Sequence, residues 1–380
     1  MKITDLEVIE LRVPGWTGAT FDGSYDNCLV LVHTDAGVTG IAEVDSVPSV
    51  IRAIIDAPPS HSHAMGLKAA ILGQDALQTA ALWDRMYDLT SYYGRRGVVI
   101  HAIGAVDIAL WDLRGKVLGQ SLATMLAATF GGMQRDRILA YGTVYPLGDT
   151  PDEVRRTIDR GLDLGLRAIK IVADPFWRND LALTETLIRT ARDHVGPDIR
   201  LMVDAATAWA HAEEGLPLMP LFRDFGFEWV EAPLPVDDLA GHARFQGFGV
   251  PIGGGDLGLT TRYEYEQAFD VGLIDIAQPD VTMVGGITEL MRVAELARVR
   301  GKRIVPHGYK SNITIATNLG FLSRHWADEP CEYSTSLSPL RWELTREHFP
   351  IGSDGRIAVP QAPGLGVSLD PATVERFRIA

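Results

Sequence analysis

The chain has 380 residues, which exceeds one ordinary hydrophobic core and favours two domains, one of them a barrel of about 200–250 residues. A hydrophobic fraction of 46% and a mean hydropathy of +0.06 are typical of a soluble globular protein. The net charge of −14, with no Lys/Arg-rich run, argues against a nucleic-acid or anionic-membrane partner. Cys28 and Cys331 are too few for a disulfide framework.

The N-terminal residues "MKITDLEVIELRVP" alternate like a strand and contain no apolar core of a signal peptide. No apolar run approaches the roughly 18 residues that a membrane-spanning helix needs. We therefore expect no transmembrane helix, no membrane partner and a cytoplasmic location.

The first hundred residues combine strands and helices in an irregular order. Alternating strands are expected at 3–13 and 27–44, the latter with a hairpin turn at 34–37. A Gly-rich segment between them, 14–26, is long enough for a functional lid. Helices are expected at roughly 66–89 and 98–118, where apolar residues recur at helical spacing.

From residue 137 onward, strand, loop and amphipathic helix alternate regularly, as in a TIM-type barrel. Strand cores are expected near 138–143, 167–172, 200–204, 227–231, 251–256, 274–279, 303–307 and 330–334. The tail after about 340 does not form a regular unit. Its strand-like runs at 357–359 and 367–369 are expected to pack back on the N-terminal domain.

Ionisable residues close seven of these runs, at intervals of 24 to 34 residues. They are Lys170, Asp204, Glu231, Asp256, Asp280, His307 and Glu332. A βα unit uses about that much chain, and the carboxyl ends of parallel barrel strands are where such barrels keep their active sites. The pattern therefore predicts an enzyme.

Asp204, Glu231 and Asp256 end consecutive strands with no basic residue among them. Three carboxylates aimed at one point repel one another unless a cation joins them. All-oxygen ligation with open positions suits Mg²⁺, so we predict a magnesium site.

The chain resembles the enolase superfamily, in its mandelate racemase-like branch, over essentially its full length. The resemblance lies in "AVDIALWDLRGK" of the N-terminal part and in "AIK", "MVDA", "WVEAP", "GGGD", "QPDVTMVGG" and "VPHG", in the family's order. It implies an α/β fold, a (β/α)7β barrel under an α+β capping domain. We expect the capping domain at 1–125, the barrel at 126–340 and a C-terminal segment at 341–380 that returns to the capping domain. Asp256 stands where this branch usually has Glu.

The resemblance implies abstraction of the proton α to a carboxylate, through an enediolate that Mg²⁺ stabilises. His307 and Asp280 match the family's His–Asp dyad, with His307 as the base. Glu332 matches the acidic donor to the substrate carboxylate, and we expect it to be protonated. Lys170 matches the first lysine of a Lys-x-Lys motif, whereas Val172 occupies the second position and cannot accept a proton.

With one base, β-elimination is the simplest outcome, so we predict a dehydratase of a sugar acid. An epimerase or lactone cycloisomerase acting through the same enediolate, and a catalytically silent relative that binds sugar acids, stay open as alternatives. Candidate substrate-binding residues are Trp16 and Tyr25 of the first loop and Arg178 and Lys310 of the strand-end loops. The resemblance also implies a homo-oligomer, a dimer or an octamer.

Overall fold

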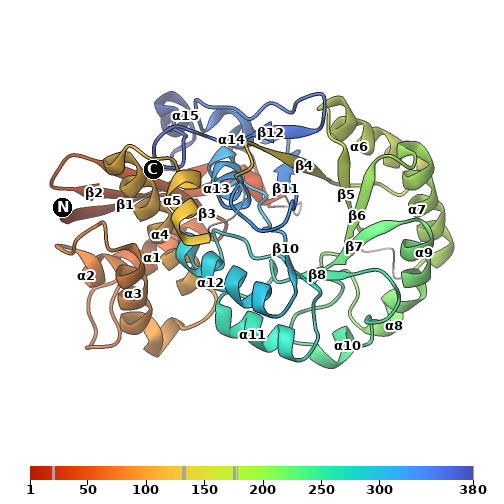
Figure 1. Ribbon diagram of the computed structural model, residues 1–380, viewed down its shortest axis with the longest axis horizontal. Coiled ribbons are helices and arrows are strands. Elements are labelled where there is room, and N and C mark those ends of the chain that lie inside the picture. Colours follow the sequence, from red (N-terminus) through yellow and green to blue (C-terminus); the bar gives the residue numbers. More distant parts are fainter. Residues whose placement is uncertain (19–21, 131–133, 174–176, 178, 380) are drawn as a thin grey trace.

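The computed structural model describes the chain apart from residues 19–21, 131–133, 174–176, 178 and 380. An antiparallel sheet with helices forms the N-terminal part, and a ring of parallel strands surrounded by helices forms the larger part beside it (Figure 1). No helix among the described residues is both long and apolar enough to cross a membrane.

The capping domain is built on a three-stranded sheet in which β2 pairs antiparallel with both β1 and β3. Its elements are β1 (Ile3–Arg12), η1 (Gly23–Tyr25), β2 (Asp26–Thr34), β3 (Thr39–Val44), α1 (Pro48–Asp56), α2 (Leu67–Ile71), α3 (Thr79–Gly94), α4 (Val98–Leu118) and α5 (Leu122–Phe130). The single helix predicted over 66–89 is divided into α2 and α3. Gly73 explains the break, because it adopts a left-handed conformation (φ 75°) and donates its N–H to the carbonyl of Ile3.

Helix α4 is the central helix of this domain, and most of its residues are buried. A helix that is apolar on nearly all sides needs partners on all sides, and α4 packs against β2, β3, α1, α3 and the barrel helix α12 (Gly286–Val299). It ends at Gly119, whose left-handed backbone (φ 64°) stops the helix.

Eight parallel strands form the barrel sheet, which confirms the predicted TIM-type fold class. They are β4 (Arg137–Val144), β5 (Ala168–Val172), β6 (Arg200–Asp204), β7 (Phe227–Glu231), β8 (Ile252–Gly254), β9 (Ile276–Ala277), β10 (Arg303–Ile304) and β11 (Cys331–Ser334). Each pairs with its neighbour from β4 to β10, and β11 returns to pair with β4. Strands β8, β9 and β10 are shorter than predicted, and each has a proline, which lacks the N–H of a ladder, within two residues of one end: Pro251, Pro279 and Pro306.

Helices surround this sheet (Figure 1). They are α6 (Pro151–Asp163), α7 (Leu181–Val195), α8 (Ala212–Gly215), α9 (Met219–Asp224), α10 (Leu239–Ala243), α11 (Arg262–Asp270), α12 and α13 (Asn312–Leu322), with a short turn η3 (Leu216–Leu218). The barrel interior is filled by the buried cluster Tyr141, Ala168, Met202, Trp229, Ile276 and Val305. This packed layer gives the strand ends above it a rigid base.

The C-terminal tail contacts both domains. It contains α14 (Pro339–Glu343), β12 (Arg356–Ala358) and α15 (Pro371–Phe377). The run predicted at 357–359 forms β12, but it pairs antiparallel with β4 of the barrel. The run at 367–369 forms only a bridge between Leu369 and Thr345, and the chain then reaches the capping domain, where the N–H of Ile379 donates to Glu10. The domain boundary drawn at 125/126 falls inside α5.

Asp107 of α4 fastens the capping domain to the barrel. Its carboxylate accepts the backbone N–H and the hydroxyl of Thr288 on α12, at 2.8 and 2.6 Å. The helices approach closely here, since a Cβ on Gly104 would lie 2.8 Å from the nitrogen of Gly286. Arg96 adds an ion pair with Glu264 on α11, at 3.3 Å. The interface here thus combines buried hydrogen bonds of Asp107 with a partly exposed ion pair of Arg96.

Replacing Asp107 should destabilise the folded protein. Asp107→Ala leaves the Thr288 donors buried without an acceptor, and we expect a loss of about 1–3 kcal/mol in the free energy of unfolding. Asp107→Asn keeps one acceptor oxygen and should lose less. Urea denaturation of the three proteins measures both values; equal stability of wild type and Asp107→Ala would contradict this view of the interface.

Candidate active site

A cavity of about 270 Å³ lies at the carboxyl ends of the barrel strands, under the capping domain. Its wall is made by Asp22, Gly23, Asp45, Thr143, Tyr145, Lys170, Val172, Asp204, Asp256, Leu257, Met283, His307, Tyr309 and Glu332. Five of the seven predicted strand-end residues line it, and the other two, Glu231 and Asp280, contact residues that do. The structure thus brings the predicted strand-end set together.

Lys170 is fully buried and lies among three carboxylates. Its Nζ pairs with Glu231, lies 3.0 Å from Glu332 Oε1 and lies 3.5 Å from Asp204 Oδ2. Burial opposes the charged form, but the charges of Glu231 and Glu332 outweigh it and hold the pKa of Lys170 well above its usual range. Lys170 is therefore a fixed positive charge and not a proton acceptor.

Asp204, Glu231 and Asp256 carry more negative charge than Lys170 compensates. Burial, with the charge of Glu231 adding to it, raises the pKa of Asp204 to about 7. Burial likewise raises the pKa of Asp256 to about 6, and its Oδ1 is buried without a hydrogen-bond partner among the described residues. Glu231 is oriented by hydrogen bonds from Trp229 and Gln278 to its Oε2.

As the side chains stand, no three His, Cys, Asp or Glu residues in the described part of the chain group closely enough to hold a metal ion. The three carboxylates of Asp204, Glu231 and Asp256 thus do not surround one point as predicted. In this structure Glu231 pairs with the ammonium of Lys170. The set nevertheless fits Mg²⁺ chemically: all its donors are oxygens, and Asp256 Oδ1 lacks the partner that a buried carboxylate oxygen needs.

His307 and Asp280 form the predicted dyad. His307 Nδ1 lies 2.7 Å from Asp280 Oδ2, so this nitrogen donates to the carboxylate and Nε2 is left for the cavity. Burial disfavours the imidazolium, but the charges of Glu332 and Asp280 outweigh burial and hold the pKa of His307 well above its usual range. The imidazolium is therefore the favoured form in this structure, and His307 must lose the proton on Nε2 before it can act as a base.

Glu332, expected to be protonated beside a bound substrate carboxylate, faces two cations in this structure. Although burial favours the neutral form, the cations Lys170 and His307 lower the pKa of its carboxyl to about 2. Its Oε1 accepts from the Thr143 hydroxyl and its Oε2 from the N–H of Gly308, at 2.9 Å for the latter. Glu332 is thus ionised, and Lys170 at 3.0 Å is the reason.

Val172, at the end of β5, lines the cavity. Among the described lining residues, only Lys170 and His307 are basic, and the ammonium of Lys170 is occupied by carboxylates. Val172 therefore presents methyl groups to the cavity at the position where the resemblance to the family implies a second base.

The four candidate substrate-binding residues lie elsewhere or outside the described part. Trp16 and Tyr25 stack on each other, with ring centroids 4.2 Å apart, in a neighbouring hollow that shares only Asp22 and Tyr145 with the cavity. Lys310 is buried and bonds to the carbonyls of Gly23 and Asp26 and to Asp45, so it anchors the capping domain. Arg178 lies outside the described residues.

Several lining residues were not predicted from sequence. Asp22 and Asp45 come from the capping domain, where no periodic pattern marks a residue as facing the barrel. Tyr309 follows His307 by two residues, and no pattern in the sequence marks it as part of the site. Thr143, near the end of β4, was the easiest to find, because it aligns with the other strand-end residues.

A barrel with carboxylates and a His–Asp pair at its strand ends, covered by a capping domain, defines a class of enzymes that remove a proton next to a carboxylate. Two family models match the chain: "Mandelate racemase / muconate lactonizing enzyme, N-terminal domain" over residues 8–127 and "Enolase C-terminal domain-like" over residues 151–373. The chain belongs to the enolase superfamily, in the branch of mandelate racemase and muconate lactonizing enzyme.

Two of the relatives are named for a reaction of a sugar acid or of its lactone. D-galactarolactone cycloisomerase of Agrobacterium fabrum is 31% identical, over 92% of this chain and 91% of that protein. L-rhamnonate dehydratase of Saccharopolyspora erythraea is 32% identical, over 79% of this chain and 74% of that protein. Among solved structures, a racemase from Streptomyces coelicolor A3(2) with bound magnesium has a TM-score of 0.84 and 27% identity, covering 99% of this chain and 100% of that one.

Asp256 gives a test of cation binding that needs no substrate. Without divalent metal, Asp256→Asn removes a buried carboxylate with an unpaired oxygen and should raise the melting temperature. Added Mg²⁺ should raise the melting temperature of the wild type by mass action and that of Asp256→Asn much less. Differential scanning calorimetry with and without Mg²⁺ measures both effects. An equal Mg²⁺ response in the two proteins would contradict a role for Asp256 as ligand.

Proposed function

We propose that this protein is a Mg²⁺-dependent hydro-lyase that removes the proton α to the carboxylate of a sugar acid and eliminates the β-hydroxyl as water. The observation that carries the proposal is the asymmetry of the cavity. The His307–Asp280 pair provides one base on one side, whereas Val172 stands where a second base would be needed.

Mg²⁺ held by Asp204, Glu231 and Asp256 would neutralise the charge that develops on the substrate carboxylate as its α-proton leaves. Lys170 supplies a second positive charge for the same carboxylate, and its high pKa keeps that charge in place. Both cations act where negative charge increases during the reaction, which is the condition for accelerating it.

His307 carries the proton transfers. Asp280 holds the Nδ1–H, so Nε2 takes the proton from C2 of the acid and an enediolate forms on the substrate. Cleavage of the C3–O bond then converts the dianionic enediolate to a singly charged carboxylate with a C2–C3 double bond, and the departing hydroxide takes the proton from Nε2 to form water. The resulting enol becomes a 2-keto acid.

A lactone cycloisomerase is the second candidate, favoured by the relative from Agrobacterium fabrum that matches over nearly the whole chain. Such a reaction uses the same base and the same stabilised enediolate, and differs in the group that leaves C3. An epimerase needs proton delivery on both faces of C2, which the methyl surface at Val172 does not support.

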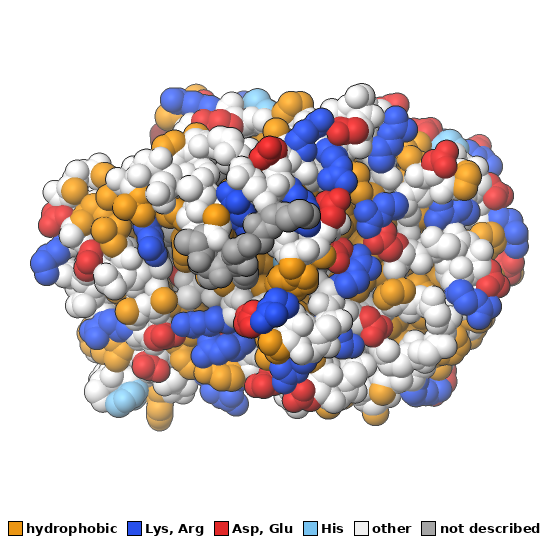
Figure 2. Space-filling view, in the orientation of Figure 1, with side chains coloured by type: hydrophobic (Ala, Val, Ile, Leu, Met, Phe, Trp, Pro, Cys, Tyr) orange, Lys and Arg blue, Asp and Glu red, His pale blue; other side chains and the backbone are white. Residues whose placement is uncertain are grey.

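We expect a small hydroxy or sugar acid as the partner, and no nucleic acid or membrane. On the face shown in Figure 2, Lys and Arg side chains are interspersed with Asp and Glu, an arrangement that provides no extended anion-binding surface among the described residues there. Assembly into a homo-oligomer, a dimer or an octamer, is part of the proposal by analogy with the family.

Incubating the protein and Mg²⁺ with a panel of sugar acids and their lactones in D₂O, and following proton NMR, tests the reaction class. A 2-keto acid lacking the C3 hydroxyl supports dehydration. Isomerisation of a lactone with deuterium incorporation supports the cycloisomerase instead, and absence of exchange with every acid of the panel contradicts the proposal.

His307→Asn tests the assigned base with any acid that is turned over. Because asparagine cannot accept the C2 proton, we expect turnover to fall by about 10²–10⁴-fold. The Mg²⁺-induced rise in melting temperature should be retained, which shows that the site is intact. Near-normal turnover would mean that another group takes the proton.

A further inference from the structure

Thr282 connects the capping domain with the catalytic pair, and no role has been assigned to it so far. It lies two residues after Asp280, in the turn that follows β9, and is buried. Its hydroxyl donates to Asp280 Oδ1 at 2.7 Å and accepts the backbone N–H of Asp45 at 3.0 Å. Asp280 in turn holds His307 through its other oxygen, at 2.7 Å.

The hydroxyl of Thr282 forms one hydrogen bond as donor and one as acceptor. A threonine hydroxyl has one proton to donate, and here that proton goes to Asp280 while a lone pair receives the Asp45 N–H. The hydroxyl orientation is therefore determined by the capping domain and the catalytic carboxylate together. Asp280 Oδ1 also accepts the N–H of Thr282, at 2.7 Å, so the hydroxyl is one of two donors to that oxygen.

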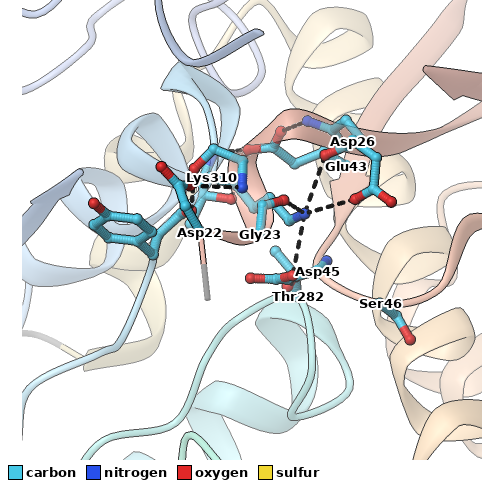
Figure 3. A network of polar contacts seen from close by, with 12 residues as sticks. Asp22, Gly23, Asp26, Glu43, Asp45, Ser46, Thr282 and Lys310 are labelled. Carbon is cyan, nitrogen blue, oxygen red and sulfur yellow. Dashed lines mark hydrogen bonds and ion pairs between the residues drawn. The ribbon is translucent and has the colours of Figure 1, made fainter. Parts of the chain in front are cut away.

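Asp45 also contacts a second barrel loop, the one that follows β10. Its Oδ1 lies 3.2 Å from the Nζ of Lys310, three residues after His307, and Lys310 also binds the carbonyls of Gly23 and Asp26 (Figure 3). Asp45 thus stands between the loop that carries Asp280 and the loop that carries His307, and it lines the cavity. The segment around Asp45 therefore contacts both the loop of Asp280, through Thr282, and the loop of His307, through Lys310.

We propose that Thr282 is a positioning residue that aligns Asp280 for His307 and makes this alignment depend on docking of the Asp45 segment. The inference rests on the proposed role of His307 as the base. Thr282 does not appear among the described residues of the cavity wall, so it acts through Asp280 and not through contact with the acid.

Removing the hydroxyl should change the basicity of the pair in one direction. A donor to Asp280 stabilises its negative charge, so its loss leaves a more basic carboxylate that holds the His307 proton more firmly. Other charged or titratable groups around the pair stay in place in such a variant. They are Glu332, Asp256, Glu231 and Asp45 near His307, and Asp45, His101 and Tyr265 near Asp280.

The decisive variants are Thr282→Val, which keeps the shape and removes the hydroxyl, and Thr282→Ser, which keeps the hydroxyl. Thr288→Val is the matched control, since it removes a buried hydroxyl that also donates to a carboxylate across the domain interface, that of Asp107. NMR titration of labelled histidine in the full chain with Mg²⁺ follows His307, identified by the resonance that His307→Asn lacks. This readout requires no substrate.

We expect Thr282→Val to lower kcat about tenfold, close to the lower end of what one hydrogen bond to a charged group contributes. The titration midpoint of His307 should rise by only about half a pH unit, because the hydroxyl acts on the imidazole through Asp280. KM should change little, and Thr282→Ser should restore both values. Thr288→Val should lower the melting temperature without moving the midpoint.

An unchanged or lower midpoint in Thr282→Val, or an equal shift in Thr288→Val, would overturn the proposal. If Thr282→Val does not fold, Thr282→Ser provides the test, because it keeps the hydroxyl. A wild-type titration midpoint of His307 in Thr282→Ser would support the positioning role, and a shifted midpoint would overturn it. A shift in Thr282→Val together with absence of α-proton exchange in the wild type would leave the positioning role standing and refute the proposed reaction.

Discussion

Charge compensation at the mouth of the barrel is the constraint on which the site depends. Four carboxylates, those of Asp204, Glu231, Asp256 and Glu332, are buried at the strand ends, and the ammonium of Lys170 pairs with all of them except Asp256. Burial, with the charge of Glu231 adding to it, raises the pKa of Asp204, and Lys170 compensates part of the negative charge through its ion pairs. The residual negative charge at Asp256 is what a divalent cation would neutralise.

The charges of Lys170, Glu332 and His307 also influence how the site would bind its substrate. Glu332 is ionised because Lys170 and His307 face it, and its charge in turn helps to keep His307 basic. A substrate carboxylate that binds Lys170 would compete with Glu332 for the ammonium. The binding of the acid and the basicity of the histidine are therefore linked through one buried carboxyl.

The capping domain completes the cavity and is held to the barrel by polar contacts. Glu43 of β3 accepts the N–H groups of Ser311 and Thr314 and the hydroxyl of Thr314 in the loop and helix after β10, while Lys310 holds the segment around Gly23. These contacts come from the loop that also carries His307. The domain that closes the cavity and the base that acts in it are thus supported by one segment of chain.

The strand-end residues could be predicted from sequence because the barrel repeats a βα unit, so regular spacing puts their side chains at one end of the sheet. No repeat marks capping-domain residues such as Asp45 and Asp22, which line the cavity. The aromatic side chains of Trp16 and Tyr25 suggested substrate binding, but the two rings stack on each other outside the cavity. The ionised state of Glu332 depends on a 3.0 Å contact that no spacing reveals. The described residues do not test the predicted cytoplasmic location and homo-oligomeric assembly, which stay predictions.

In the proposed reaction His307 is the base on one face of the substrate's α-carbon, and the opposite face has none. Val172 and the carboxylate-bound Lys170 are the reason, and both C2 epimers of an acid that the protein turns over can be compared in D₂O. Proton NMR should show deuterium entering C2 of one epimer while the other keeps its proton. Comparable exchange from both epimers would contradict the claim, since it requires a second base opposite His307.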